Sequence, residues 1–442
     1  MARIREQYLK LNWEVIDNAT DLQRVKLLLQ GLDDEDLMRR LERARKGRRN
    51  EYPVRVCWNC FLSGILLGHA TVAALLRELM RNPSLRLAVG MNPTKGEDAV
   101  PTKDAMSRFG KKLLSGGYRR RVEAVAHELV EKAREYLPDL GKHLAVDSTA
   151  IRTWARGRRD ASRSSDPEAR WGYKIRRWMG KDGREHEDVR KWFGYKMHLL
   201  VDTQHELPVG WRQTSADKDD HNQVEPLLDD LEENHGEMNV ETLAGDKAYD
   251  DGKLIAKLYK ERGGIRAVFD MRSMSKDGED GEAIPGSGNL VLGDDGAVYC
   301  YAKEGDRLIR QQMAYWGFEK DRMCQKWRCP AAVTKFRCPD REVCSPTEYG
   351  RTVRVKCEKD WRRFGPMPRG TKGRRRRYNG RTAVERVNSR IKTGLTLDDV
   401  HVRGKARVGL RSTLAIIVLL GMAVGQLKKK SKAWRSLTRL AR

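Results

Sequence analysis

The chain of 442 residues is predicted to be an α/β protein with a mixed sheet, an all-helical N-terminal region and a β-rich insertion. Up to about residue 140, apolar residues recur three and four apart between Gly, Pro and Asn breaks, which indicates helices. From His143 onward, short runs rich in β-branched residues replace this pattern. Three consecutive strands, then helix, strand, helix and strand, favour a sheet with helices packed on it.

Four regions follow from these changes in pattern. Residues 1–140 are expected to form a helical domain for DNA binding or dimerisation, although an ordinary packing domain explains the pattern equally well. Residues 141–272 hold the first part of the α/β core. Residues 273–372 form the β-rich insertion, and residues 373–442 hold the last core helices and a basic tail.

The core elements are expected in a fixed order along the chain. Its strands are predicted at 143–151, 195–203, 207–215, 240–245 and 264–272, and its helices at 221–234 and 250–262. Asp250 and Asp251 suit an N-cap for the second of these helices. The apolar run from Leu414 to Val424 is too short to span a bilayer, contains Gly421, and is interpreted as a buried core helix.

Two segments interrupt this core. Between Ile151 and Trp192, arginines alternate with tryptophans, which suits either a loop that tracks a nucleic-acid strand or a surface hairpin whose tryptophans are buried. The insertion is expected to contain a hairpin around Gly293–Gly296.

Cysteines occur at two places in the sequence. In the insertion, their irregular spacing is compatible with a structural zinc site or with free thiols, and the cysteines concerned are Cys324, Cys329, Cys338 and Cys344, followed by Cys357. Cys57-x2-Cys60 lies in an apolar run without a second pair nearby, and is interpreted as part of a buried helix.

The charge of the chain indicates a polyanion as partner. The formal net charge is +26, and twelve Lys or Arg residues lie between Arg351 and Arg377, ending in the run Arg374, Arg375, Arg376 and Arg377. A solubility charge and a membrane-surface protein are the alternatives. The first residues are charged throughout and lack an apolar signal segment, so we expect a cytoplasmic, nucleoid-associated protein without a membrane partner.

Three separated acids predict a two-metal site. Asp147 and Asp246 each end a predicted strand, and Glu385 follows much later on a predicted helix. Magnesium prefers hard oxygen ligands and keeps several waters, so a few converging carboxylates are sufficient protein ligation. At about 100° per residue, Glu385 shares an arc of roughly 60° with Tyr378, Arg381 and Lys392. Gly380 is a possible break that would leave Tyr378 in the preceding loop.

The spacing Tyr378-x2-Arg381-x3-Glu385-x6-Lys392 resembles the signature of the Tyr-Arg-Glu-Lys branch of DDE transposases from bacterial insertion sequences. The segments around Gly194–Asp202 and Asp246 are also similar to that family. The resemblance covers about residues 144–392, extends into the terminal apolar helix and includes a helical N-terminal region.

This resemblance implies an RNase H-like core. Asp147, Asp246 and Glu385 would be the triad that holds two Mg²⁺ ions, which Mn²⁺ can replace. Arg381 and Lys392 would contact phosphates near the cut, and Tyr378 the transposon end. His221 also resembles a family position, with a helix-start residue as the alternative. The implied activity is cleavage at the terminal inverted repeats followed by strand transfer into target DNA, carried out by a homodimer on double-stranded DNA.

Three other functions remain open at this point. An RNase H-like nuclease would share the triad but would form no strand-transfer products. An inactive DNA-binding remnant or repressor would keep the basic surface. A zinc-dependent regulator would depend on the cysteine region.

Overall fold

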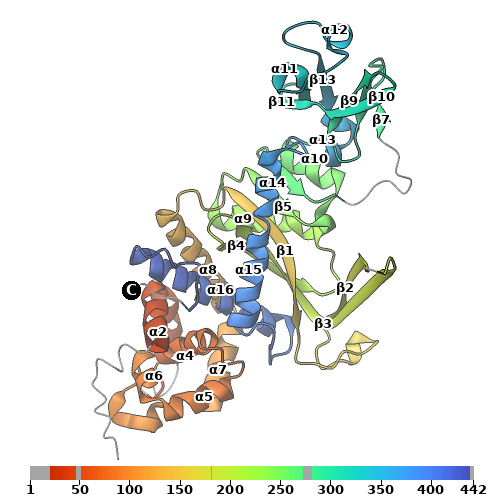
Figure 1. Cartoon of the computed structure of the whole chain (residues 1–442). Coiled ribbons are helices and arrows are strands. Elements are labelled where there is room, and N and C mark those ends of the chain that lie inside the picture. Colours follow the sequence, from red (N-terminus) through yellow and green to blue (C-terminus); the bar gives the residue numbers. More distant parts are fainter. Residues whose placement is uncertain (1–19, 46–50, 181, 272–280, 439–442) are drawn as a thin grey trace, which may run out of the picture.

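The computed structural model describes residues 20–45, 51–180, 182–271 and 281–438. A mixed sheet lies at the centre, the N-terminal helices lie at one side of it, and the insertion lies at the opposite end of the molecule (Figure 1). The predicted α/β class is therefore confirmed, together with the helical N-terminal part and the β-rich insertion.

The central sheet has the order β2-β3-β1-β5-β6, and β4 pairs with β3. Strands β3 and β4 continue the sheet antiparallel from β1, whereas β5 and β6 continue it parallel on the other side. This is the RNase H-like arrangement. The strands are β1 (His143–Arg152), β2 (Arg170–Met179), β3 (Glu185–Asp202), β4 (Pro208–Ser215), β5 (Thr242–Gly245) and β6 (Arg266–Phe269).

Strand β3 is far longer than the predicted strand at 195–203. Its second half pairs with β1 and β4, and its first half pairs with β2 to form a two-stranded arm that projects from the sheet (Figure 1). The Arg/Trp segment is therefore largely a hairpin. Trp192 is buried, whereas Trp154 and Trp178 are 52% and 44% exposed, so only some of its tryptophans pack.

Helices cover the sheet and the N-terminal part. Those of the sheet are α9 (Val224–His235) and α10 (Gly252–Lys260), close to their predicted positions, and α14 (Lys372–Asn379) and α15 (Thr382–Ser389). Those before the sheet are α2 (Thr20–Gly31), α3 (Glu35–Arg43), α4 (Val54–Leu66), α5 (Val72–Arg81), α6 (Pro83–Ala88), the 3₁₀ segment η1 (Pro93–Ala99), α7 (Lys103–Leu114) and α8 (Gly117–Tyr136).

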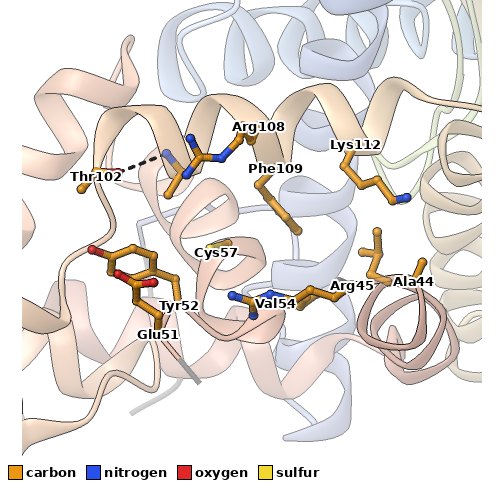
Figure 2. A pocket seen from close by; sticks show the side chains of 12 residues that line it. Ala44, Arg45, Glu51, Tyr52, Val54, Cys57, Thr102, Arg108, Phe109 and Lys112 are labelled. Carbon is orange, nitrogen blue, oxygen red and sulfur yellow. Dashed lines mark hydrogen bonds between the residues drawn. The ribbon is translucent and has the colours of Figure 1, made fainter. Parts of the chain in front are cut away.

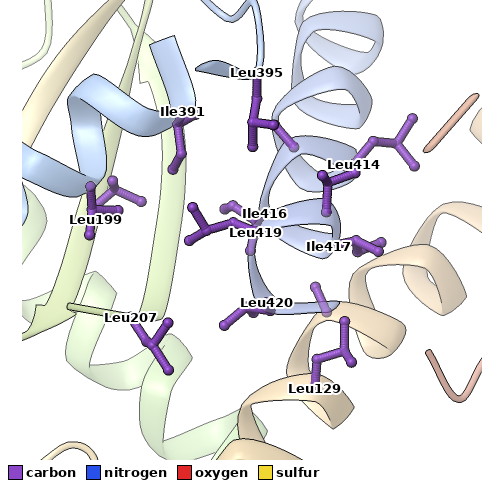
Figure 3. Packing of buried hydrophobic residues seen from close by; sticks show 14 of the residues in the cluster. Leu129, Leu199, Leu207, Ile391, Leu395, Leu414, Ile416, Ile417, Leu419 and Leu420 are labelled. Carbon is purple, nitrogen blue, oxygen red and sulfur yellow. The ribbon is translucent and has the colours of Figure 1, made fainter. Parts of the chain in front are cut away.

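The last long helix, α16 (Lys405–Lys428), lies between the N-terminal helices and the sheet. Figure 3 shows its leucines and isoleucines facing Leu199 of β3 on one side and Leu129 of α8 on the other. By length and composition α16 could cross a membrane, but 83% of its apolar window is buried inside the protein. The prediction of a buried core helix is confirmed.

The insertion is built from two small sheets. One has the order β10-β9-β8-β7 and the other β11-β12-β13. The predicted hairpin is confirmed as β8 and β9, with Leu292 opposite Val298. The strands are β7 (Glu282–Ala283), β8 (Leu290–Leu292), β9 (Val298–Glu304), β10 (Arg307–Gln312), β11 (Ala314–Glu319), β12 (Cys324–Arg328) and β13 (Thr352–Lys356), with short helices α11 (Pro330–Val333), α12 (Arg341–Cys344) and α13 (Trp361–Phe364).

Candidate active site

Asp147 and Asp246 meet where the parallel pairing of β1 and β5 ends, and this place is the edge at which the candidate site lies. Asp246 directly follows β5, as predicted. Asp147 instead lies in the middle of β1, which continues to Arg152 because its outer half pairs with β3, so the prediction that Asp147 ends a strand is wrong.

The register of β1 and β5 pairs Leu144 with Leu243 and Ala145 with Ala244. Continued for two residues beyond the pair Ala145 and Ala244, this register places Asp147 opposite Asp246. Neighbouring strands lie about 4.8 Å apart and equivalent positions point to the same face, so the two carboxyl groups are adjacent.

The environment of Asp147 favours its protonated form. Burial raises the pKa of Asp147 to about 6, with Lys174 acting against the rise and Asp246 and Asp220 adding to it. Bringing two carboxylates together in a partly desolvated place raises the free energy of the charged state. A cation placed between them would relieve this repulsion.

Tyr249 and Asp220 belong to the same electrostatic cluster, and the sequence did not single out either residue. Tyr249 is 1% exposed, and its hydroxyl has no hydrogen-bond partner among the described residues. Burial and the charges of Asp147, Asp220 and Asp246 raise the pKa of Tyr249 well above its usual value. Buried polar groups usually have a hydrogen-bond partner, so the Tyr249 hydroxyl beside these three carboxylates leaves room for one further polar group to bind there.

Helix α15 brings Glu385 to this edge through Asn388. The Asn388 amide Nδ2 donates to Oδ2 of Asp147 at 3.1 Å. Glu385 lies three residues earlier in α15, so it shares the same helix face, one turn away. The side chain of Glu385 is half exposed and pairs with Arg381, Nη1 to Oε1 at 2.7 Å.

Arg381 connects the helix to the second aspartate. Burial would lower the pKa of Arg381, but the charges of Glu385, Tyr378 and Asp246 raise it. A partly exposed ion pair four residues apart on a helix contributes only about 0.3–0.5 kcal/mol. A phosphate or a metal ion can therefore displace either member of this pair at little cost.

Tyr378 and Lys392 lie on either side of α15, outside its regular turns. Tyr378 is in α14, which is separated from α15 only by a tighter turn at Gly380 and Arg381. Both residues keep helical φ and ψ, but hydrogen bonds such as that from the Arg381 amide to the Tyr378 carbonyl reach back three residues instead of four. Lys392 lies in a π-helical turn, η6 (Arg390–Gly394), and its amine contacts Oδ1 of Asp398 at 2.9 Å. The regular α-helix on which the predicted 60° arc depended is therefore interrupted at both places, without a loop at Gly380.

The four arginines before Tyr378 have different environments. Arg374 donates to the carbonyl oxygen of Phe269 at 2.6 Å, and burial, aided by Arg369, lowers its pKa to about 9. Arg375 and Arg376 are exposed, and Arg377 is partly exposed. Arg374 thus holds α14 against β6, while its neighbours face solvent.

The acids near Asp246 have structural roles. Asp251 caps α10 by accepting from the Leu254 amide at 2.7 Å, as predicted. Asp250 instead is buried and pairs with Arg362 at 2.6 Å, which ties the core to α13 of the insertion. The N-cap prediction is therefore correct for Asp251 and wrong for Asp250. His221 begins a short 3₁₀ helix before α9, the alternative given for it.

The comparisons with known proteins give one family match. The profile of the transposase DDE domain family matches residues 138–420, which include β1, β5, α15 and most of α16. The chain belongs to this family. No curated protein matches it significantly. The solved structures include a piggyBac transposase synaptic complex with hairpin DNA, at 10% identity and a TM-score of 0.39, with 96% of this chain and 80% of that chain covered.

Members of this family are enzymes of DNA transposition. The letters DDE stand for two aspartates and one glutamate, and Asp147, Asp246 and Glu385 are the candidates for them in this chain. Within the described residues, however, no three His, Cys, Asp or Glu side chains stand close enough to hold one ion as they are placed. The carboxylate of Glu385 pairs with Arg381 instead. Asp147 and Asp246 offer hard oxygen ligands of the kind that a divalent cation such as Mg²⁺ takes.

The cysteines of the transposase are grouped differently from the predicted set. Cys324 and Cys329 lie at opposite ends of β12, and a strand of that length separates them by roughly 15 Å. Cys324 donates to Glu319 at 3.6 Å, whereas Cys329, Cys338 and Cys344 line a different cavity together with Cys300 of β9. Cys57 and Cys60 are buried in α4, as predicted.

A second hollow lies among the N-terminal helices, outside the acidic site. Its volume is about 550 Å³, and Figure 2 shows Arg108 and Lys112 of α7 on one side and Arg45 on the other. Tyr52 and Phe109 supply aromatic walls. This basic and aromatic lining is compatible with the prediction that the N-terminal region binds DNA or forms a dimer, which stays a prediction.

Proposed function

We propose that the chain is an insertion-sequence transposase of the Tyr-Arg-Glu-Lys branch, which cleaves DNA at the transposon ends and transfers the freed strand to target DNA. The observation that carries this proposal is the register of β1 and β5, which aligns Asp147 with Asp246 beside the helix of Glu385. The family match supports the reaction class.

Asp147, Asp246 and Glu385 would hold two Mg²⁺ ions, or Mn²⁺ in their place. When bound, such ions activate the attacking oxygen and stabilise the leaving oxygen of an in-line displacement. Asn388 keeps Asp147 oriented toward this edge. Arg381 can exchange Glu385 for a phosphate, because the two partners of a half-exposed pair are held weakly.

The substrate would be double-stranded DNA bearing the terminal inverted repeats. Lys174 of the β2 arm lies within electrostatic reach of Asp147, so the arm adds positive charge beside the proposed cut. Arg375 and Arg376 of α14, both exposed, add charge on the other side. Phosphate contacts of this kind supply affinity without sequence preference. A homodimer, with each copy holding one end, and a nucleoid-associated location in the cytoplasm belong to the same proposal.

The test uses the DNA that flanks the gene on both sides, where the proposal expects short inverted repeats. Purified full-length chain with Mg²⁺ is expected to release a 3′-hydroxyl at the repeat end and to join it to a target plasmid. Asp147→Asn, Asp246→Asn and Glu385→Gln should each remove cleavage but keep end binding, while the exposed control Asp321→Asn keeps both. Undiminished cleavage by a triad variant would remove that residue from the site.

The products also separate the other candidate functions. Cleavage without joined products would indicate a nuclease. Sequence-specific binding without cleavage in any divalent metal would indicate an inactive remnant or repressor. Light scattering of the chain with and without end DNA measures whether a dimer forms.

A further inference from the structure

Four cysteine side chains line one cavity in the insertion. The elements that carry them, β9, α11 and α12, lie at the end of the molecule away from α15 (Figure 1). The cavity has a volume of about 20 Å³, and the cysteines come from β9 (Cys300), from the residue before α11 (Cys329), from the loop between α11 and α12 (Cys338) and from the end of α12 (Cys344). A space of this size holds about one small atom or ion. All four are free thiols.

The four sulfur atoms influence each other electrostatically. Burial raises the pKa of Cys300 to about 12, and the charges of Cys329, Cys338 and Cys344 add to that rise. Burial and the charges of Cys329 and Cys344 likewise raise the pKa of Cys338. The neighbouring thiols thus oppose ionisation of Cys300 and Cys338, and a divalent cation bound among them would favour it instead.

Positively polarised groups already face this cluster. Asn289 Nδ2 lies 3.5 Å from Sγ of Cys344, and Nη1 of Arg351 lies 3.8 Å from the same sulfur. Arg341 also lines the cavity. Four thiolates around a divalent ion carry a net charge of about −2, and donors next to the sulfurs are the usual way to stabilise that charge.

The segment that carries three of these cysteines is held by hydrogen bonds but contributes no buried residue to the apolar core of the insertion. The apolar core of the insertion consists of residues from β8, β9, β12, β13 and their surroundings, and none of its buried members lies between residues 329 and 351. Within that segment the regular structure is two helices of four residues each, and Val343 is 91% exposed. Small units with so little core usually need a metal or a disulfide.

We propose that Cys300, Cys329, Cys338 and Cys344 bind one structural zinc ion that fixes the 329–351 segment to β9. Tetrahedral zinc takes four thiolates at about 2.3 Å in closed structural sites. The sulfur atoms as placed do not form a ready coordination sphere, so binding requires them to rotate inward and to lose their protons. This set contains Cys300 in place of Cys324.

The decisive measurement is metal content with matched serine variants. The full-length chain, purified with zinc and freed of excess metal, should contain one zinc ion per chain. Cobalt in its place should give the visible bands of a tetrahedral ion and the sulfur charge-transfer intensity of four thiolates. Cys300→Ser, Cys329→Ser, Cys338→Ser and Cys344→Ser should each lose tight binding. The controls Cys324→Ser and Cys357→Ser, in the same insertion, should keep it.

Alkylation of the unaltered chain tests the proposal without any variant that could misfold. With zinc bound, these four cysteines should resist alkylation, and a chelator should expose them together while the labelling of Cys324 and Cys357 stays the same. Absence of stoichiometric zinc, disulfides within the set, or zinc loss in Cys324→Ser with retention in Cys300→Ser would overturn the proposal. Because no acid of the catalytic site takes part, Asp246→Asn should bind zinc normally even if cleavage is never observed.

Discussion

Asp147 lies in the middle of β1, partly buried beside a neighbour of the same charge, and its ionisation is therefore linked to folding. Its pKa in the folded chain, about 6, lies above the ordinary value of 3.8. Between these two values the folded state holds a proton that the unfolded state has lost. Stability consequently falls as pH rises from about 4 to about 6, and stays low above that range.

We expect Asp147→Asn to stabilise the metal-free chain at neutral pH. The shift of about two pKa units corresponds to roughly 2–3 kcal/mol as an upper estimate. Denaturant unfolding in a chelator should show this gain at pH 7.5 and little difference from the unaltered chain at pH 4. Added Mg²⁺ should stabilise the unaltered chain alone. A gain of equal size at both pH values would contradict the linkage.

Asn388 is expected to act as a positioning residue through its bond to Asp147. Loss of a group that orients a metal ligand typically weakens metal affinity about 10–100-fold. Asn388→Ala should therefore raise the Mg²⁺ concentration needed for half-maximal cleavage by about that factor, with the maximal rate partly recovered at high Mg²⁺. The exposed neighbour Ser389→Ala is the matched control on the same helix. A lower rate at every Mg²⁺ concentration, without a change in the half-maximal value, would count against this role.

At the residue scale, the sequence predicted those candidate residues whose position follows from the local strand or helix pattern around them. Asp147 lies in a strand pattern, Asp246 follows one, and Asp251 precedes a helix. Asn388, Tyr249 and Asp220 were missed because they lie on three different parts of the chain, α15, the turn after β5 and the loop after β4, which only the packing around β1 brings together. The grouping of cysteines failed for a similar reason: spacing along the chain cannot show that β12 separates Cys324 from Cys329 or that β9 supplies Cys300.

At the scale of elements, α14 divides its arginines between packing and solvent. Arg375→Ala and Arg376→Ala should each weaken DNA binding and lower the slope of log affinity against log salt by about one. Arg374→Ala should keep that slope but lower the free energy of unfolding by about 1–3 kcal/mol, because it leaves the carbonyl of Phe269 without its donor. Salt titrations and denaturant unfolding measure the two effects. Equal salt slopes for all three variants would refute this division.

The helix of Glu385 differs from its prediction at both ends. The predicted arc assumed one regular helix from Tyr378 to Lys392, with Gly380 as a possible break. The structure has a tighter helical turn at Gly380 and Arg381 and a π-helical turn from Arg390 to Gly394. π-Helical turns add a residue to the helix and are frequent at functional sites. They depend on tertiary contacts, so a pattern with a fixed period cannot reveal them.

On the scale of the whole molecule, α16 joins the N-terminal helices to the sheet by close backbone contact. A Cβ at Gly31 would overlap the carbonyl oxygen of Gly421, and one at Gly425 would come within 2.7 Å of the Leu27 oxygen. Gly31→Ala should therefore lower the free energy of unfolding by about 1–3 kcal/mol, the usual cost of overpacking. Gly117→Ala, in α8 with open space around it, is the control and should be neutral or stabilising. Equal unfolding midpoints for the two variants would rule out this packing.

The order of core strands and helices was predictable because each carries its own hydrophobic pattern. The packing of α16 against α2 and α8 was not predictable, because the sequence of an apolar helix does not show which elements cover it. The β2–β3 arm was only half recognised, because its outer part is exposed on both faces and lacks the alternation of a half-buried strand.

The position of α16 also has a consequence for the synthesis of the protein. Leu27 and Leu28 of α2 are covered by Gly421 and Gly425 of α16, which are synthesised much later than α2. Until then the first helices expose apolar surface, and an interrupted chain that contains all three acids but not α16 still lacks the centre of its core. Such incomplete products should therefore be degraded rather than act on DNA, so that synthesis through α16 is a condition for activity.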